Sequence, residues 1–80
     1  MPDDPDALSF RVTTANLSGA IQILLERGGL AEYPEVYPAL VLERSRRELQ
    51  SPPKEIRLTR QAFDGLPHDV QQLLLAPPVR

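Results

Sequence analysis

Two stretches of the chain share one pattern, a strand-like run followed by a helix-like run, and this pattern constrains the fold most. Residues 10–25 and 56–74 each begin with an apolar residue, Arg, an apolar residue and Thr. Each stretch ends in an apolar residue, Gln, any residue and two leucines. Alternating apolar and polar residues are typical of a half-buried strand, whereas apolar residues at every third and fourth position are typical of an amphipathic helix. We therefore expect two strand-then-helix units.

The alternating runs predict two short strands, residues 9–13 and 55–59. Their apolar side chains share one face of each strand: Phe10 and Val12 in the first, Ile56 and Leu58 in the second. Two strands alone are marginally stable in water, so helices must cover the apolar face. We expect the two strands to pair as a small antiparallel sheet.

Three helices are predicted, over residues 16–27, 38–50 and 67–75. Apolar residues recur at helical spacing in the first and the third. Gly28-Gly29 stands where a helix end is expected, and Pro67 stands where a helix start is expected. The order of elements is then β-α-α-β-α, which is an α+β fold.

The central segment admits a second interpretation, because its first residues are apolar on every side. Residues 39–44 begin Ala-Leu-Val-Leu and would also suit a strand. The continuation, ERSRRELQ, is rich in strong helix formers and favours the helix. In a helix, opposite charges four residues apart attract one another, and two pairs have this spacing: Glu43 with Arg47, and Arg44 with Glu48.

Eighty residues are enough for one small domain, and we set its bounds at residues 9–76. Residues 1–8 hold two prolines and three aspartates, so we expect them to form a flexible acidic arm. Residues 77–80 are expected to form a short tail. A core of this size contributes only about 3–5 kcal/mol, so a partner surface is one way in which such a domain gains stability.

The amino-acid composition argues against several classes of function. The chain has no cysteine and one histidine, which excludes a disulfide framework and the usual Cys and His zinc sites. The net charge of −2 argues against a general nucleic-acid surface, and no apolar run approaches the roughly 20 residues that span a bilayer. The acidic beginning is unlike a secretory signal, so we expect a cytoplasmic protein. Eight of the nine basic residues are Arg, which suggests a bacterial or phage source with GC-rich DNA.

Chemically active residues are sparse. His68 stands beside Asp69 and near Asp64, an arrangement that would orient a general base, but a solvated position at a helix start is the favoured interpretation. A metal held by these three residues would need further ligands that the segment lacks. No glycine-rich loop precedes a helix where a phosphate would bind. We expect no enzymatic activity, no cofactor, no metal and no small-molecule substrate.

Surplus apolar and aromatic residues point to a protein partner. Tyr33 and Tyr37 each precede a proline, which stiffens the loop after the first helix, and tyrosine offers large contact area at low entropic cost. The sequence predicts a non-catalytic protein-binding module, such as an accessory subunit, adaptor or inhibitor, whose partner is another protein or a second copy in a homodimer. The predicted contact residues are Tyr33, Tyr37, Leu40, Val41 and Leu75. The alternative is that these side chains complete a small core.

A second hypothesis is a small DNA-binding or transcription-modulating protein. It rests on Arg44, Arg46 and Arg47, because a helix with three arginines would suit a major groove. Glu43 and Glu48 interleave with these arginines and can pair with them. Nucleic acid is therefore the less favoured partner.

Overall fold

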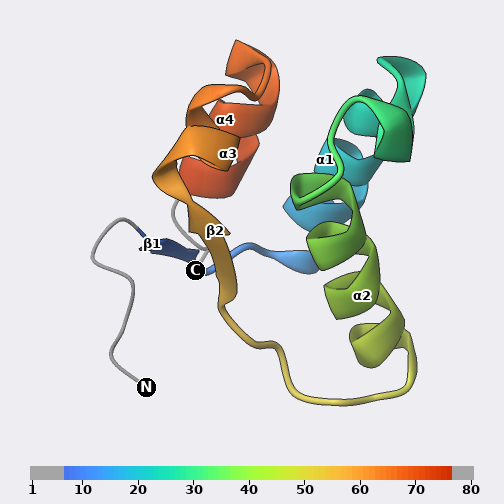
Figure 1. Ribbon diagram of the computed structural model, residues 1–80. Coiled ribbons are helices and arrows are strands. Elements are labelled where there is room, and N and C mark those ends of the chain that lie inside the picture. The colour runs from blue at the N-terminus through green and yellow to red at the C-terminus, as the bar shows by residue number, and fades with distance from the viewer. Residues whose placement is uncertain (1–6, 77–80) are drawn as a thin grey trace.

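The computed structural model describes residues 7–76 and shows a small α+β fold (Figure 1). A two-stranded antiparallel sheet and four α-helices follow the order β-α-α-β-α-α, so the expected fold class is confirmed, with a short fourth helix added. The elements are β1 (Ala7–Phe10), α1 (Thr14–Glu26), the 3₁₀-helix η1 (Gly29–Ala31), α2 (Val36–Glu48), β2 (Ile56–Thr59), α3 (Arg60–Asp64) and α4 (His68–Leu75).

The two strands pair as expected, although the first lies earlier in the chain than residues 9–13. In the sheet, Leu8 lies opposite Leu58 and Phe10 lies opposite Ile56. Ala7 and Leu8, which we expected in the flexible arm, therefore belong to β1. The remainder of that arm and the expected tail, residues 77–80, lie outside the described residues.

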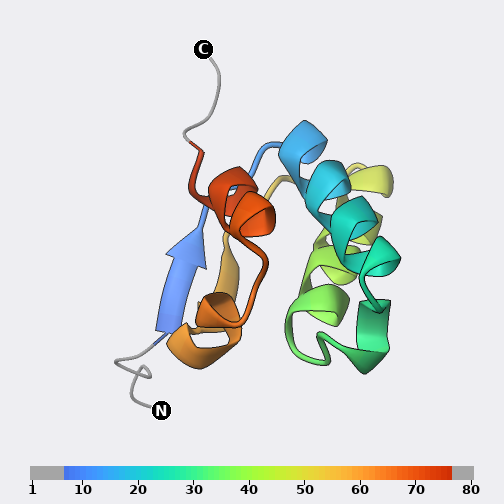
Figure 2. The same ribbon diagram turned by 90° about the horizontal axis from the view of Figure 1, so that it is seen from above.

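Helices and sheet form two packed halves around one core. The sheet, α3 and α4 form one half, and α1 and α2 form the other (Figures 1 and 2). Helix α1 packs against both α2 and α4, so its apolar residues lie at the centre of the molecule. The fully buried leucines, which come from both halves, are Leu17, Leu24, Leu40, Leu58 and Leu74. On the core face of the sheet, the rings of Phe10 and Phe63 stack with centroids 5.0 Å apart.

The shared pattern of the two stretches has a shared local structure. Thr13 caps α1, since its side chain accepts a hydrogen bond from the N–H of Asn16 at 3.1 Å. Thr59 caps α3 in the same way, accepting from the N–H of Ala62 at 3.2 Å. A threonine cap satisfies one of the donors that a helix start leaves unpaired. The second unit differs because Gly65-Leu66-Pro67 interrupts it, so its helix is divided into α3 and α4.

Helix boundaries shift by small amounts for identifiable reasons. Helix α2 begins at Val36, two residues before Pro38, because a first-turn residue needs no N–H partner within the helix. It ends at Glu48, and Gln50 follows with a φ of 65°, a left-handed geometry that no helix continues. The strand interpretation of residues 39–44 is wrong, because this segment lies inside α2.

Two carboxylates bond to the outer edge of β2 and to the residue before it, one from the N-cap of helix α2 and one from within that helix. Glu35, the residue that precedes α2, accepts from the backbone N–H of Thr59 at 3.0 Å and from its hydroxyl at 3.2 Å. Glu43 accepts from the N–H of Lys54, just before the strand, at 2.8 Å. These oxygens take the place of a neighbouring strand's carbonyls. Within residues 7–76 no third strand joins the sheet, and β1 lies at its margin (Figure 2).

Candidate protein-binding surface

Helix α2 has an uncharged face that points to solvent. Its inner face is fixed by the buried Val36, Leu40 and Glu43. Residues spaced by four, three and four positions share one face of a helix, and on the opposite side this spacing aligns four exposed residues. We call this face the α2 outer stripe; it consists of Pro38, Leu42, Ser45 and Leu49, the last at the C-cap of the helix.

The leucines of the α2 outer stripe are the most exposed large apolar side chains of the described residues. Leu42 is 64% exposed and Leu49 is 80% exposed. They stand seven residues apart, which is about 10 Å along a helix, with Ser45 between them. Single exposed leucines are ordinary, whereas two on one uncharged helix face form a patch. Three more exposed leucines lie on other elements: Leu25, Leu30 and Leu75.

The predicted contact residues are only partly brought together. Tyr37 lies in the first turn of α2 and Tyr33 lies just before the helix, and the N–H of Tyr37 donates to the carbonyl of Tyr33 at 3.0 Å. Both tyrosines and Val41 are half-buried and pack against the core. Leu75 is 57% exposed, but it belongs to α4, which packs against α1.

Leu40 lies in the core and is not part of an exposed surface, contrary to the prediction. Its side chain has no exposed area, because it points from α2 into the core. The segment Ala39-Leu40-Val41-Leu42 is apolar on every side, so the sequence does not say which leucine points outward. The structure shows Leu42 in that position, and Leu49 was missed. The signal that would have found both is their spacing of seven residues on a helix.

The three arginines of the DNA-binding hypothesis are held by carboxylates of their own helix. Arg47 donates from Nε to Oε2 of Glu43 at 2.7 Å, and Arg46 donates from Nη1 to Oε1 of Glu43 at 2.8 Å. Arg47 is 7% exposed and also donates to the hydroxyl of Thr14 at 3.2 Å. Arg44 lies 3.4 Å from a carboxylate oxygen of Glu48. The expected pairs at four-residue spacing are confirmed.

Glu43 is a buried carboxylate at the centre of this cluster. Its side chain is 6% exposed, and each oxygen accepts at least one hydrogen bond. Burial by itself would raise the pKa of Glu43. The N–H of Lys54 and the guanidinium groups of Arg47 and Arg46 outweigh burial and hold that pKa below its ordinary value. The sequence marks the pairing of this residue, but only the fold shows that it joins α2 to the segment before β2.

The Glu43 cluster predicts a loss of stability in acid. A depressed pKa in the folded state means that the stabilisation is complete above the ordinary glutamate pKa and disappears as the pH falls through the lower, folded-state pKa. We expect the free energy of unfolding to decrease below about pH 4.5 more steeply in the parent protein than in Glu43→Gln. Urea unfolding at a series of pH values measures both slopes, and equal slopes would contradict the prediction.

His68 and the acidic residues near it, Asp64 and Asp69, lie at the surface. His68 is exposed at the first position of α4, and Asp69 lies 3.2 Å from Arg27 of the α1 C-cap, to which it is ion-paired. No group of three or more His, Cys, Asp or Glu within residues 7–76 is placed to hold a metal ion. In the same range, no helix has the length and apolar character required to cross a bilayer.

Comparisons with known proteins found no relative of this chain. No protein-family model, curated protein sequence or solved structure matches the chain.

Proposed function

We propose that the protein is a non-catalytic protein-binding module, such as an accessory subunit, adaptor or inhibitor, that binds its partner through the α2 outer stripe. The observation that supports this proposal is the exposure of Leu42 and Leu49 on one uncharged face. The same helix carries five charged residues, all of them outside that face: Glu43, Arg44, Arg46, Arg47 and Glu48.

The free energy gained by burying the two leucines of the α2 outer stripe is large enough for them to anchor the protein in a partner's groove. Complete burial of an exposed leucine contributes about 1.5–3 kcal/mol, so two leucines supply a substantial part of a micromolar affinity. Arg44 and Glu48 are exposed on the flank of the helix and would form a polar rim. The inner face of α2 is fixed by the core and by the Glu43 cluster, so little ordering entropy is lost on binding.

The arrangement of charges supports a protein partner over nucleic acid. Arg46 and Arg47 both bond to Glu43, and Arg47 has little accessible surface. A phosphate contact would require these bonds to break and would leave the buried carboxylate of Glu43 without its guanidinium partners. We also propose that the module works in the cytoplasm of a bacterial or phage-infected cell, a setting that the arginine usage of the sequence suggests.

A paired set of variants tests the α2 outer stripe. Leu42→Asp with Leu49→Asp should reduce capture of a specific partner from a cell lysate at least about tenfold, because two buried apolar anchors become charged. Quantitative mass spectrometry of the captured proteins measures the loss. The matched control is Leu25→Asp with Leu30→Asp, which charges two other exposed leucines and should leave capture unchanged. Equal capture by both double variants would exclude the stripe as the binding surface.

A further inference from the structure

A hollow adjoins the α2 outer stripe on the flank that faces β2. It has a volume of about 230 Å³ and lies between α2 and residues 54–57. Leu42 forms part of its wall, together with two further apolar residues, Ala39 and Ile56. A partner that covers Leu42 therefore covers this hollow as well, and the residues that line it help to define the partner.

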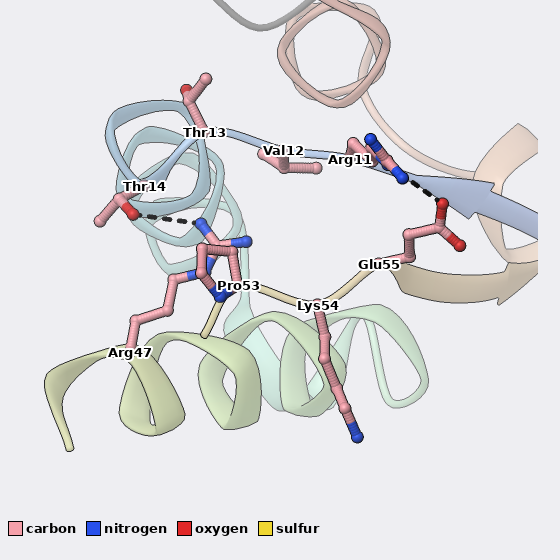
Figure 3. Close-up of a pocket in the computed structure, with 8 residues that line it drawn as sticks. All are labelled: Arg11, Val12, Thr13, Thr14, Arg47, Pro53, Lys54 and Glu55. Carbon is pink, nitrogen blue, oxygen red and sulfur yellow. Dashed lines mark hydrogen bonds and ion pairs between the residues drawn. The ribbon is translucent and has the colours of Figure 1, made fainter. Parts of the chain in front are cut away.

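Positive charge gathers around this hollow. The cations that line it are Arg46, Lys54 and Arg57. Two carboxylates line it as well, but Glu43 is buried and bonded to arginines, and Glu55 lies 3.3 Å from Arg11 (Figure 3). Lys54 is exposed, and its ammonium group points away from the larger hollow that Arg11 borders (Figure 3). A partner at Leu42 therefore meets more positive than negative charge.

The charged side chains of the described residues are divided between two ends of the molecule. Residues 43–57, which run from α2 to β2 at the bottom of Figure 1, contain with Arg11 six cations and three carboxylates. Residues 26–35 and 60–69 contain two cations and five carboxylates. These two segments lie together at the opposite end, because Glu35 bonds to Thr59 and Arg27 is ion-paired with Asp69. The α2 outer stripe ends at Leu49, so it runs into the positive end.

We propose that the partner which covers the α2 outer stripe does so with an acidic amphipathic helix. Its apolar side chains pack on Leu42 and Leu49, and its carboxylates lie against Lys54 and Arg57 at the rim of the hollow. The inference rests on the proposed function and deepens it, because it names the chemistry of the partner at the same surface.

The geometry of the stripe favours a helix as the partner segment. Leu42 and Leu49 are about two helical turns apart, and a helix that lies along α2 presents apolar side chains at the same interval. The positions that flank those side chains then face the residues beside the stripe. On the β2 side these residues are the three cations of the hollow, whereas on the other side Arg44 and Glu48 are paired with each other. Acidic residues on one flank of the partner helix complement this arrangement.

The exposed leucines favour a peptide over a nucleic acid as the acidic partner. Phosphates would be attracted to the same cations, but a duplex that is held through its backbone leaves Leu42 and Leu49 uncovered. Arg46 keeps its bond to Glu43 at 2.8 Å and therefore contributes charge rather than a direct contact. Carboxylates around an apolar contact add specificity and speed association, and salt reduces both effects.

Two synthetic peptides of about 15 residues test the proposal with the full chain. Both have leucines at helical spacing, and their flanking positions are glutamate in the acidic peptide and lysine in the basic peptide. In fluorescence anisotropy at about 0.05 M NaCl, the acidic peptide should bind at least about tenfold more tightly, and the difference should shrink at about 0.5 M NaCl. No binding of the acidic peptide, or equal binding of both peptides, would overturn the proposal. A DNA duplex that binds more tightly than the acidic peptide would overturn it as well.

Matched charge reversals locate the contact. Lys54→Glu with Arg57→Glu should weaken binding of the acidic peptide about tenfold or more. Arg27→Glu with Arg60→Glu changes the net charge equally at the opposite end and should weaken binding less than about threefold. Equal weakening by the two double variants would exclude the contact with Lys54 and Arg57. If the first double variant is not folded by circular dichroism, Lys54→Glu alone should weaken binding about threefold, with Arg60→Glu as its control.

A further variant tests whether acidic residues of the chain itself occupy these cations. Asp3→Asn combined with Asp4→Asn and Asp6→Asn should change the affinity for the acidic peptide less than about threefold. A gain of about tenfold or more would mean that the chain supplies its own carboxylates, and it would overturn the assignment to a partner.

Leu42→Ala with Leu49→Ala separates failure of this inference from failure of the proposed function. The double variant should lose both binding of the acidic peptide and capture of the partner, because both depend on the stripe. If capture depends on the leucines but the acidic peptide is not preferred, only the acidic helix is refuted. If capture does not depend on the leucines, the proposed function is refuted. Peptide binding that survives the double variant would show that the cations act alone, which contradicts the inference.

Discussion

Replacing Glu43 by Ala should decrease the free energy of unfolding by about 3–5 kcal/mol, the largest effect we expect from one polar substitution. The substitution leaves the guanidinium of Arg47, which is 7% exposed, without the carboxylate that lies 2.7 Å away. It also leaves the N–H of Lys54 without its acceptor. A buried charge with no partner costs far more than the pair contributed when intact.

The size of this effect is large against the stability of the whole domain. A chain of 80 residues has a free energy of unfolding of about 4–12 kcal/mol at the usual amount per residue. Urea unfolding followed by circular dichroism measures the loss. The control is Glu43→Leu with Arg47→Leu, which removes both charges and should recover part of the stability. A Glu43→Ala protein within about 1 kcal/mol of the parent would show that the cluster does not hold α2 to the segment before β2.

Leu40→Ala should decrease the free energy of unfolding by about 2–5 kcal/mol, while Leu42→Ala should change it by about 0.5 kcal/mol or less. Leu40 has no exposed side-chain area and leaves a cavity when truncated, whereas Leu42 is 64% exposed. Both lie on α2 and lose the same atoms, so helix propensity and chemistry are matched. Urea unfolding compares their stability.

The two variants should affect partner capture in the opposite order to their effects on stability. Leu42→Ala should weaken partner capture because it removes an anchor of the α2 outer stripe, and Leu40→Ala should not, provided that the protein remains folded. Equal losses of stability for the two variants would mean that the helix is rotated relative to the arrangement described here. If the Leu40→Ala protein is folded but captures less partner, Leu40 is a contact residue as the sequence predicted.

Local sequence rules predicted the two-stranded sheet and three of the four helices in their order, but not the short helix α3. Alternation at Ile56 and Leu58 identified the second strand, whereas alternation at Phe10 and Val12 identified only the end of the first, because Val12 lies after β1. The threonines that precede α1 and α3 act as caps. These local rules did not predict where β1 begins. Ala7 and Leu8 follow an acidic, proline-containing segment, and it is their pairing with Thr59 and Leu58 that makes them a strand.

The binding surface was less predictable because it depends on which way α2 faces. A helix that is apolar on all sides over residues 39–42 can be rotated in several ways, and contacts with α1 and β2 select one. The pairing of Glu43 with Arg47 followed from spacing, but the burial of Glu43 depends on the segment before β2 lying against the helix. The bonding of Glu35 and Glu43 along the outer edge of β2 is likewise a property of tertiary structure.

The position of the two strands in the chain has a consequence for the order of folding. The sheet joins residues 7–10 to residues 56–59, so its formation closes a loop that contains both α1 and α2. Closing so long a loop is entropically costly, whereas α1 and α2 are neighbours in sequence and pack antiparallel, with Arg47 near the end of one reaching Thr14 at the start of the other. We expect the pair of helices to form first and to serve as the surface on which the sheet closes, so that the rate of folding is set by strands that meet last.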